Sequence, residues 1–273
     1  MGAKETLFIL SFLMKNIVIE EPTYQGLISL LKFIDKKPVY TIPIDNEGVK
    51  VEELEELLRK GIRPDFVYTV TINNPTGYVT SEERKKHLLE LAEDYDFKII
   101  EDDIYGFYCF ESDCKPLKYF DKSERVIYVS SVSKIISPGL RIGYIISNDL
   151  RDKIREIKSE INHQVSSLDQ LIVKEVVNDS RFPDYLNKAR DGYRQKRDFM
   201  INFVEKLGID CSKPKGGFFM FCKGEIPKEI RVLSGRKFFY DESKGDGYYR
   251  ISYSNIDIEE IAKLLKSDHY KYG

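Results

Sequence analysis

The sequence predicts an α/β fold, in which helices cover a mostly parallel sheet and a smaller α+β unit follows. As far as Ile146, short apolar runs alternate with segments of helical period, at the spacing of right-handed βαβ units. From Asp149 to Lys206 the period is helical, and two short strand patterns come after it. We therefore expect a large domain over residues 1–185 and a small C-terminal domain over residues 186–273.

The elements expected first have recognisable starts and ends. The helix over 51–60 has acidic residues early and Arg59 and Lys60 late, as the helix dipole favours, and Gly61 ends it. Ser81 is expected to cap the next helix. In chain order we expect a buried helix at 6–14, strand 17–20, helix 24–35, strand 39–44, helix 51–60, strand 66–72, helix 82–95 and strand 97–100.

The apolar runs at 126–129 and 142–146 predict two more buried strands of the same parallel sheet. After them the pattern becomes helical and then returns to strands. In chain order we expect helices at 149–164, 168–177 and 185–206, strands at 218–222 and 248–253, and a closing helix at 258–265.

Composition argues against several classes of protein. The chain has 273 residues, of which 42% are hydrophobic and 32% charged, as in ordinary globular proteins. A net charge of −2 leaves no basic excess for binding nucleic acid, and the apolar run from Thr6 to Met14 is too short to cross a membrane. The four cysteines form no C-x-x-C pair, and there are three histidines. We therefore expect neither a metal site nor a disulfide framework, and a cytoplasmic location.

The loop from Ser130 to Gly143 carries the first chemical signal. Lys134 lies at the mouth of the expected sheet, where partial burial beside other cations favours a neutral lysine that attacks carbonyl groups. Ser131, Ser133 and Arg141 are suited to hold a phosphate, Arg141 with its bidentate fork. Pyridoxal phosphate (PLP) requires this combination of a lysine and a phosphate site. Taken alone, the stretch is equally compatible with an ordinary polar turn.

A second motif overlaps this loop. Ser131 and Lys134 also fit the S-x-x-K pattern of penicillin-binding serine acyltransferases. That chemistry needs S-D-N and K-T-G elsewhere, and neither tripeptide occurs in the sequence. It also needs the serine and the lysine on one helix, which Pro138 and Gly139 would interrupt. We therefore exclude this alternative.

Two other strand ends carry unusual polar residues. Asn74 follows one expected strand, and Asp102 with Tyr105 follows another, at the edge where such sheets bind their ligands. A carboxylate at this position suits a protonated pyridine nitrogen, while Tyr105 and Asn74 could reach the ring hydroxyl. Asp103 is the alternative carboxylate, but only Asp102 has the three-residue spacing to Tyr105. Each residue alone could equally be part of a turn or a helix cap.

Six motifs in a fixed order resemble one known family. They are E-E-P-T-Y at 20–24, N-N-P-T-G at 73–77, D-D-I-Y at 102–105, S-x-S-K with P-G-L-R-I-G-Y over 131–144, P-K-G-G-F-F at 214–219 and Y-R-I-S-Y at 249–253. The chain resembles class I/II PLP-dependent aminotransferases over essentially its whole length. The resemblance is greatest to aminoadipate- and aromatic-type aminotransferases and to the aminotransferase-like domains of bacterial transcription regulators.

The resemblance implies PLP fold type I, with a sheet of the seven-stranded type, and a homodimer that moves an amino group between an amino acid and a 2-oxo acid. It implies that Lys134 bonds covalently to PLP and later moves a proton, and that Asp102 keeps the pyridine nitrogen protonated. It implies that Asn74 and Tyr105 contact the ring hydroxyl. The remaining expected contacts are Tyr24 on the ring face, Ser131, Ser133, Arg141 and the backbone of Gly2, Ala3 and Lys4 on the phosphate, and Arg250 with Asn74 on the substrate.

Two of these assignments have plain structural alternatives. Tyr24 could be a core tyrosine after a turn, and Arg250 could form a surface ion pair. The family also has a segment that precedes the position of Gly2 and completes part of the small domain and the substrate pocket. The resemblance therefore implies an N-terminally truncated member, and it supports PLP binding better than full activity. The alternative is a truncated member that binds PLP and has little activity. The other functions compatible with the motifs are a ligand-sensing regulator domain without turnover and a PLP lyase of the same fold.

Overall fold

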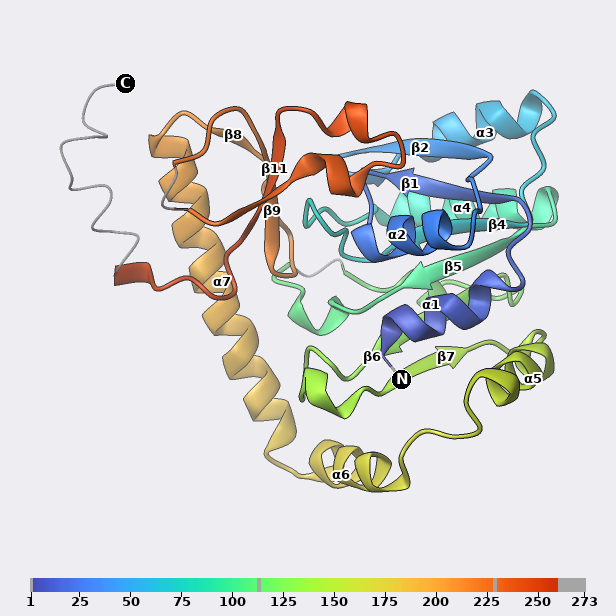
Figure 1. The fold of residues 1–273 in the computed structure, drawn as a ribbon. Helices are drawn as coiled ribbons and strands as arrows, with labels where there is room; N and C mark the ends of the chain where they lie inside the picture. Colours follow the sequence, from blue (N-terminus) through green and yellow to red (C-terminus); the bar gives the residue numbers. More distant parts are fainter. Residues whose placement is uncertain (1, 112–113, 228–229, 260–273) are drawn as a thin grey trace.

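The computed structural model describes residues 2–111, 114–227 and 230–259 and arranges their strands in two sheets (Figure 1). The larger sheet has seven strands. In spatial order they are β3 (Gly48–Val49), β2 (Tyr40–Asp45), β1 (Ile17–Glu21), β4 (Phe66–Val70), β5 (Lys98–Asp102), β6 (Val126–Ser131) and β7 (Gly143–Ile146). The five strands from β2 to β6 run parallel, which confirms the α/β fold that the sequence predicts.

One predicted strand direction is wrong. β7 runs antiparallel to β6, with Ser131 paired to Gly143, and its outer residues Tyr144 and Ile146 are exposed. Only residues 132–142 connect the two strands, whereas a parallel crossover needs about a dozen residues or more, usually including a helix. The short connection therefore folds back as a loop. This return brings Lys134 and Arg141 to the same edge of the sheet as Asp102.

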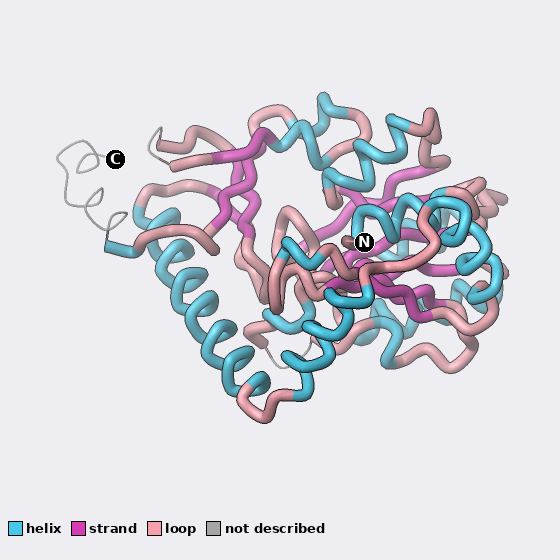
Figure 2. The backbone as a smooth tube through the Cα atoms, turned by 60° about the horizontal axis from the view of Figure 1, so that its bottom comes forward, coloured by secondary structure: helices cyan, strands magenta, loops and turns pink. Residues whose placement is uncertain are grey.

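Helices cover both faces of this sheet. α1 (Ala3–Ser11), α2 (Gln25–Phe33) and α5 (Arg151–Ile161) lie on one face, and α3 (Val51–Arg59) and α4 (Glu82–Asp94) lie on the other (Figures 1 and 2). The predicted cap of α4 is confirmed, since Ser81 Oγ accepts the Arg84 N–H at 3.3 Å. α1 begins at Ala3, before the apolar run, because the apolar residues mark only its buried face.

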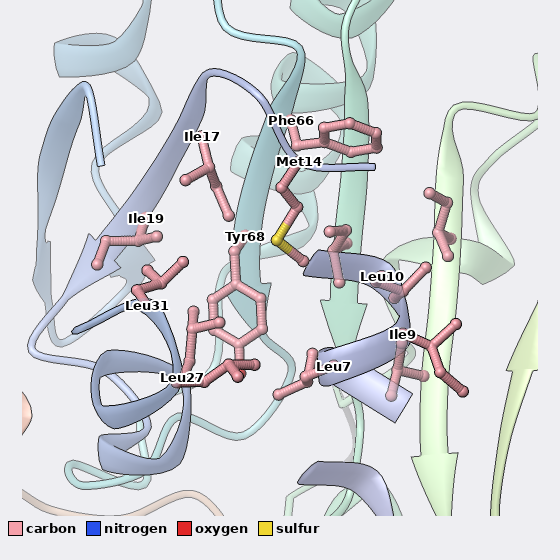
Figure 3. Close-up of a cluster of buried hydrophobic side chains, with 14 of the residues drawn as sticks. Leu7, Ile9, Leu10, Met14, Ile17, Ile19, Leu27, Leu31, Phe66 and Tyr68 are labelled. Atoms are coloured by element: carbon pink, nitrogen blue, oxygen red, sulfur yellow. The ribbon is translucent and has the colours of Figure 1, made fainter. Parts of the chain in front are cut away.

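The alternation of strand side chains decides which residues reach which face. Figure 3 shows the core between the sheet and the first two helices, formed by Leu7, Leu10, Leu27, Leu31, Ile17, Ile19 and Tyr68 among others. Val18 and Ile99 point the other way and pack against α3 and α4. Because side chains alternate along a strand, Glu20 and Glu101 follow Val18 and Ile99 toward that second face. Asp102 lies on the first face, beside Tyr68.

The smaller sheet is antiparallel throughout and packs against a long helix. Its strands are β10 (Val232–Ser234), β11 (Tyr248–Ser252), β9 (Phe219–Lys223) and β8 (Asp210–Cys211). Met200 and Phe203 of α7 (Phe182–Lys206) contact Met220 and Ile251 of the sheet in one cluster. Figures 1 and 2 show α7 along the side of the molecule, with this sheet at one end and α6 (Ser167–Asn178) at the other. The helix predicted at 258–265 lies almost wholly outside the described residues.

The expectation of no disulfides is also wrong. Cys109 is bonded to Cys114, and Cys211 is bonded to Cys222. Cys211 and Cys222 are direct partners across β8 and β9, so the strand register brings their side chains together. Cys109 and Cys114 are joined across the loop that follows β5. A search for C-x-x-C spacing detects neither pair, because both are created by folding rather than by a local motif.

Candidate active site

The predicted site residues meet in one cavity at the carboxyl ends of β4, β5 and β6. The cavity has a volume of about 310 Å³. Eleven of the twelve predicted residues line it: Ala3, Lys4, Tyr24, Asn74, Asp102, Tyr105, Ser131, Ser133, Lys134, Arg141 and Arg250. The twelfth, Gly2, lies directly behind Arg141 at the start of α1. The structure thus brings together the residues that the motifs single out, while their roles remain predictions.

Asp102 presents a free carboxylate oxygen to this cavity. It is buried at the end of β5, and its Oδ2 accepts the Tyr68 hydroxyl at 2.7 Å. Among the described residues its Oδ1 has no hydrogen-bond partner. Burial raises the pKa of Asp102 to about 7, with a smaller contribution from the charge of Asp103. An N–H cation beside Oδ1 would satisfy the orphaned acceptor and favour the carboxylate form, which fits a protonated pyridine ring.

Asp103 does not line the cavity. Its Oδ2 accepts the Tyr128 hydroxyl at 2.8 Å, and its backbone carbonyl accepts the Ser130 hydroxyl at 2.6 Å. A Cβ at Gly106 would lie 2.5 Å from Asp103 Oδ1, so this side chain packs under the turn that follows β5. The structure therefore places Asp102, rather than its neighbour, at the predicted position.

Lys134 projects from the loop between β6 and β7. Its pKa is lowered by burial of the ammonium group and, to a smaller extent, by the charge of Arg250. The Tyr108 hydroxyl donates to the Lys134 carbonyl at 2.8 Å and fixes the backbone at this point. The ammonium nitrogen lies 5.9 Å from the centre of the Phe218 ring. This environment increases the neutral, nucleophilic fraction of the lysine.

An anion-binding corner forms where the same loop meets α1. Arg141 has a left-handed backbone (φ 52°), and its guanidinium would lie only 2.3 Å from a Cβ at Gly2. The positive end of the α1 dipole and a cation therefore meet, an arrangement that a bound anion stabilises. Ser131 Oγ and Ser133 Oγ lie 2.8 Å apart at this corner. The donors present fit a phosphate group.

The small sheet contributes Arg250 on the opposite side of the cavity. Ile251 packs against α7, so the alternation of β11 turns Arg250 to the other face, as the sequence predicts. Arg250 Nη1 donates to Asn74 Oδ1 at 2.9 Å, and the guanidinium lies 3.8 Å from the centre of the Phe219 ring. Its Nε is buried without a partner among the described residues. This geometry suits a carboxylate that would complete the hydrogen bonds of the guanidinium.

Two tyrosines enclose the space between these groups. Tyr105 is buried, with its ring edge-on to Phe218 at 5.3 Å and to Phe219 at 5.9 Å. Burial raises the pKa of Tyr105 well above its ordinary value, so the phenol keeps its proton. Tyr24 folds back over the first turn of α2, where a Cβ at Gly26 would lie 2.3 Å from its ring. Both side chains line the cavity, as predicted.

Sequence reasoning missed several residues of this site. Gln25, Val70, Ile104, Pro138 and Phe219 also line the cavity, although Phe219 belongs to a motif that the sequence singles out. Tyr68, which holds Asp102, was detectable in principle, because a tyrosine in a fully buried strand needs a partner for its hydroxyl. In the described ranges, no group of three or more His, Cys, Asp or Glu side chains could hold a metal ion.

The fold is that of the PLP fold type I aminotransferases. The model of the aminotransferase class I and II family matches residues 1–267, and the chain belongs to that family. It is 34% identical to aromatic-amino-acid aminotransferase 1 of Thermococcus litoralis, over 92% of this chain and 65% of the relative. A kynurenine aminotransferase of Pyrococcus horikoshii, solved with PMP, superposes with a TM-score of 0.86 at 29% identity, over 97% of this chain and 72% of that one.

The family extends beyond enzymes. The HTH-type transcriptional regulator YdfD of Bacillus subtilis is 30% identical over 91% of this chain, which spans only 54% of the regulator. Aromatic-type aminotransferases and regulators are both among the relatives, as the motifs predict. The family and its solved structures make this chain a transferase of amino groups and imply PLP as its cofactor.

Proposed function

We propose that this chain binds PLP in the described cavity and moves an amino group between an amino acid and a 2-oxo acid. When bound, PLP supplies an electron sink that makes the Cα proton of the amino acid acidic. Lys134 would bond the cofactor and then accept and return the Cα proton. Arg250 would hold the α-carboxylate, and Asp102 would keep the positive ring nitrogen paired.

The remaining residues would orient the two ligands. Ser131, Ser133, Arg141 and the first turn of α1, with Gly2, Ala3 and Lys4, would hold the phosphate. Asn74 and Tyr105 would contact the ring hydroxyl, and Tyr24 the ring face. The observation that best supports the proposal is the unpaired Oδ1 of Asp102 in the same cavity as Lys134. The relatives suggest aromatic amino acids, kynurenine and 2-aminoadipate as substrates.

Covalent labelling tests the cofactor site. Borohydride treatment of the PLP-loaded chain should attach the cofactor to Lys134, as located by mass spectrometry of peptides. Lys4 also lines the cavity and is the matched control, so Lys4→Met should keep the label and Lys134→Met should lose it. A label on any other lysine would contradict the proposal. Turnover is measured separately, with L-tyrosine, L-kynurenine and L-2-aminoadipate as donors and 2-oxoglutarate as acceptor.

A ligand-sensing role is the second candidate, favoured by the likeness to the Bacillus regulator. It predicts that the chain takes the PLP label and binds amino acids but returns no amino group to a 2-oxo acid. A lyase would release a fragment of the amino acid instead. The products formed from the three donors therefore separate these possibilities.

Assembly, domains and location complete the proposal. We expect a homodimer, because Leu168 and Leu171 of α6 are 68% and 55% exposed, and light scattering can test it.

The two separate sheets support a large domain over residues 1–185 and a small domain over residues 186–273. No helix in the described part of the chain is long and apolar enough to span a membrane. We also expect a cytoplasmic location. Disulfides are rare in the cytoplasm except in heat-adapted organisms, so the two disulfides would then indicate a heat-adapted source. The abundance of lysine and glutamate and the absence of tryptophan agree with such a source.

A further inference from the structure

Glu20 is a buried acid outside the cavity wall that none of the roles above uses. It lies at the end of β1, where it is 1% exposed. Its Oε1 accepts the Val70 N–H at 3.1 Å and Asn73 Nδ2 at 2.7 Å, and its Oε2 accepts the Thr69 hydroxyl at 2.7 Å. The carboxyl group thus ties β1 to the end of β4 and to the turn that follows it.

Through its hydrogen bond to Asn73, Glu20 affects the whole turn over residues 73–77. Asn73 Oδ1 accepts both the Thr76 N–H at 3.1 Å and the Thr76 hydroxyl at 2.8 Å. The Asn73 carbonyl accepts the Gly77 N–H at 2.7 Å. The turn over 73–77 is therefore closed around one amide side chain. Asn73 Nδ2 donates to Glu20 Oε1 at 2.7 Å and to the Pro22 carbonyl at 3.0 Å, so the Glu20 side chain and the backbone just after β1 set the direction of that amide together.

The residue inside this turn faces the cavity. Asn74 accepts the Arg250 guanidinium at 2.9 Å and so helps to set its position. A shift of the turn would move Asn74 and leave Arg250 without this partner. The contacts form a continuous chain that starts at Glu20, passes through Asn73 and its turn to Asn74, and ends at Arg250.

We propose that Glu20 is a positioning residue that holds the Asn74–Arg250 pair in place for the carboxylate of the amino acid. This inference rests on the function proposed above. It concerns the substrate carboxylate first, because among the described residues no hydrogen bond joins this chain to the phosphate corner at Ser131 and Arg141. Toward the cofactor it would act only through the proposed contact of Asn74 with the ring hydroxyl.

The charge of Glu20 is not essential for this role. Burial raises the pKa of Glu20 to about 7, while its three hydrogen bonds act in the opposite direction. A neutral Glu20 with its proton on Oε2 can donate to the Thr69 hydroxyl, and Oε1 still accepts from Val70 and Asn73. A glutamine with its carbonyl at the same place reproduces these bonds. Glu20→Gln is therefore the conservative variant, and Glu20→Leu removes every bond.

Glu101 provides a matched control on the same face of the sheet. It is also 1% exposed, its pKa is likewise raised by burial to about 7, and it accepts from a threonine hydroxyl, that of Thr71. Its other donors are the N–H groups of Leu117 and Lys118, which belong to a turn that does not line the cavity. Glu101→Leu should reduce stability through a comparable loss of hydrogen bonds without moving Asn74.

The experiment compares amino-acid and PLP affinities of the full chain loaded with PLP, by spectroscopic titration with whichever of the three donors reacts best. Glu20→Leu should raise the Kd for the amino acid by about tenfold and the Kd for PLP by no more than about threefold, because Lys134 and the phosphate corner are unchanged and only the Asn74 contact to the ring hydroxyl is disturbed. Glu20→Gln and Glu101→Leu should stay within about threefold of wild type. Equal weakening in both leucine variants, or an unchanged Kd in Glu20→Leu, would overturn the inference.

A fourth variant applies if Glu20→Leu does not fold. Asn73→Ala cuts the same chain but leaves the Glu20 bonds to Thr69 and Val70 in place, and it should raise the amino-acid Kd to a similar extent. An unchanged Kd in Asn73→Ala would also overturn the inference. Failure of the proposed function is distinct, because the wild-type chain itself would then bind no PLP or react with no donor.

Discussion

At the scale of single residues, the site depends on hydrogen-bond capacity that the protein itself leaves unused. Among the described residues, Asp102 Oδ1 and Arg250 Nε have no hydrogen-bond partner, although Tyr68 holds the other oxygen of Asp102 and Asn74 holds Nη1 of Arg250. Buried polar groups without partners are rare, because each costs about 1–3 kcal/mol. Two such groups of opposite charge, in residues that line one cavity, favour a ligand that carries both a cation and a carboxylate.

Asp102 and Asp103 give the first prediction at this scale. Asp102→Asn removes the charge beside the ring nitrogen and should slow loss of the Cα proton by about 100-fold or more, because the developing negative charge loses its electron sink. Asp103→Asn should slow the same step only a few-fold, because Asp103 faces Tyr128. Stopped-flow absorbance of the PLP-loaded chain measures both rates. Equal losses of rate in the two variants would contradict the assignment of Asp102 as the partner of the ring nitrogen.

Arg250 gives the second prediction. Arg250→Lys should weaken amino-acid binding by roughly 10- to 100-fold, since charge-assisted hydrogen bonds contribute about 1.5–3 kcal/mol and a lysine lacks the planar fork. PLP affinity should hardly change. Arg236→Lys is the control, because Arg236 pairs with Asp246 at the surface of the same unit. The assignment is contradicted if titration finds the same amino-acid Kd in Arg250→Lys and wild type.

Sequence could predict the residues that face the ligand but not those that hold them. Asn74, Asp102 and Lys134 follow strands directly, so their place at one edge follows from the fold class alone. Glu20 and Tyr68 act across strands, and their partners are 53 and 34 residues away in the chain. Such contacts depend on strand order and register, which one sequence does not specify.

At the scale of elements, β1 joins the two sheets through consecutive acids. Glu20 points to one face and holds the turn with Asn74, while Glu21 points the other way. Glu21 accepts the Tyr240 N–H at 2.7 Å and the Lys244 ammonium at 2.8 Å. The Thr23 N–H donates to the Phe238 carbonyl at 2.9 Å. The segment 238–244 precedes β11, so these bonds fix the small unit against the large sheet.

This contact gives a prediction at the scale of elements. Lys244→Met leaves the nearly buried Glu21 carboxylate without its cation and should lower the free energy of unfolding by about 1–3 kcal/mol. Lys32→Met removes an exposed pair with Glu242 in the same segment and should cost under about 1 kcal/mol. Urea unfolding of both variants tests the difference. Equal effects would show that Glu21 does not depend on its cation.

The element order was predictable, and its exceptions have physical causes. Long amphipathic helices and apolar runs identified the elements up to α7, apart from the short β3. β8, β3 and β10 were missed because strands of two or three residues carry no measurable alternation. The direction of β7 was predicted incorrectly because apolar composition identifies a strand but not its orientation, which the length of the connection decides. The cysteine pairs were missed because their side chains meet only in the folded sheet and loop.

At the scale of the whole molecule, five carboxyl groups are buried near the carboxyl edge of the large sheet, those of Glu20, Glu21, Glu101, Asp102 and Asp103, and burial also raises the pKa of Asp103. Burial raises the pKa of Glu20, Glu101 and Asp102 to about 7 each. Their ordinary values are 4.5 for the glutamates and 3.8 for the aspartate. The folded chain therefore binds protons that the unfolded chain has released. The stability of the protein without cofactor should depend on pH in the opposite sense to that of ordinary ion-paired carboxylates.

The sign of this dependence follows from proton linkage. Between about pH 5 and pH 7 the folded state holds more protons than the unfolded state, so the free energy of unfolding falls as pH rises. Each group contributes up to about 1.4 kcal/mol per pH unit. Acids with lowered pKa values, such as Asp45, Asp121, Asp149 and Glu242, act in the opposite direction, and their contribution to stability is lost as pH falls below about 5. Maximum stability is therefore expected at about pH 5.

Urea unfolding at a series of pH values from 4 to 8 tests this last prediction. Glu101→Gln removes one titrating group without altering the cavity. The free energy of unfolding should therefore fall less steeply with pH, by the equivalent of up to one proton. PLP should flatten it as well, because a cationic ring nitrogen beside Asp102 would keep that carboxylate ionised in the folded state. Stability that rises between pH 5 and 7 would contradict burial as the dominant influence on these groups. If PLP does not change the slope of the free energy of unfolding against pH, Asp102 does not contact the ring nitrogen of the cofactor, even if Glu20 and Glu101 behave as expected.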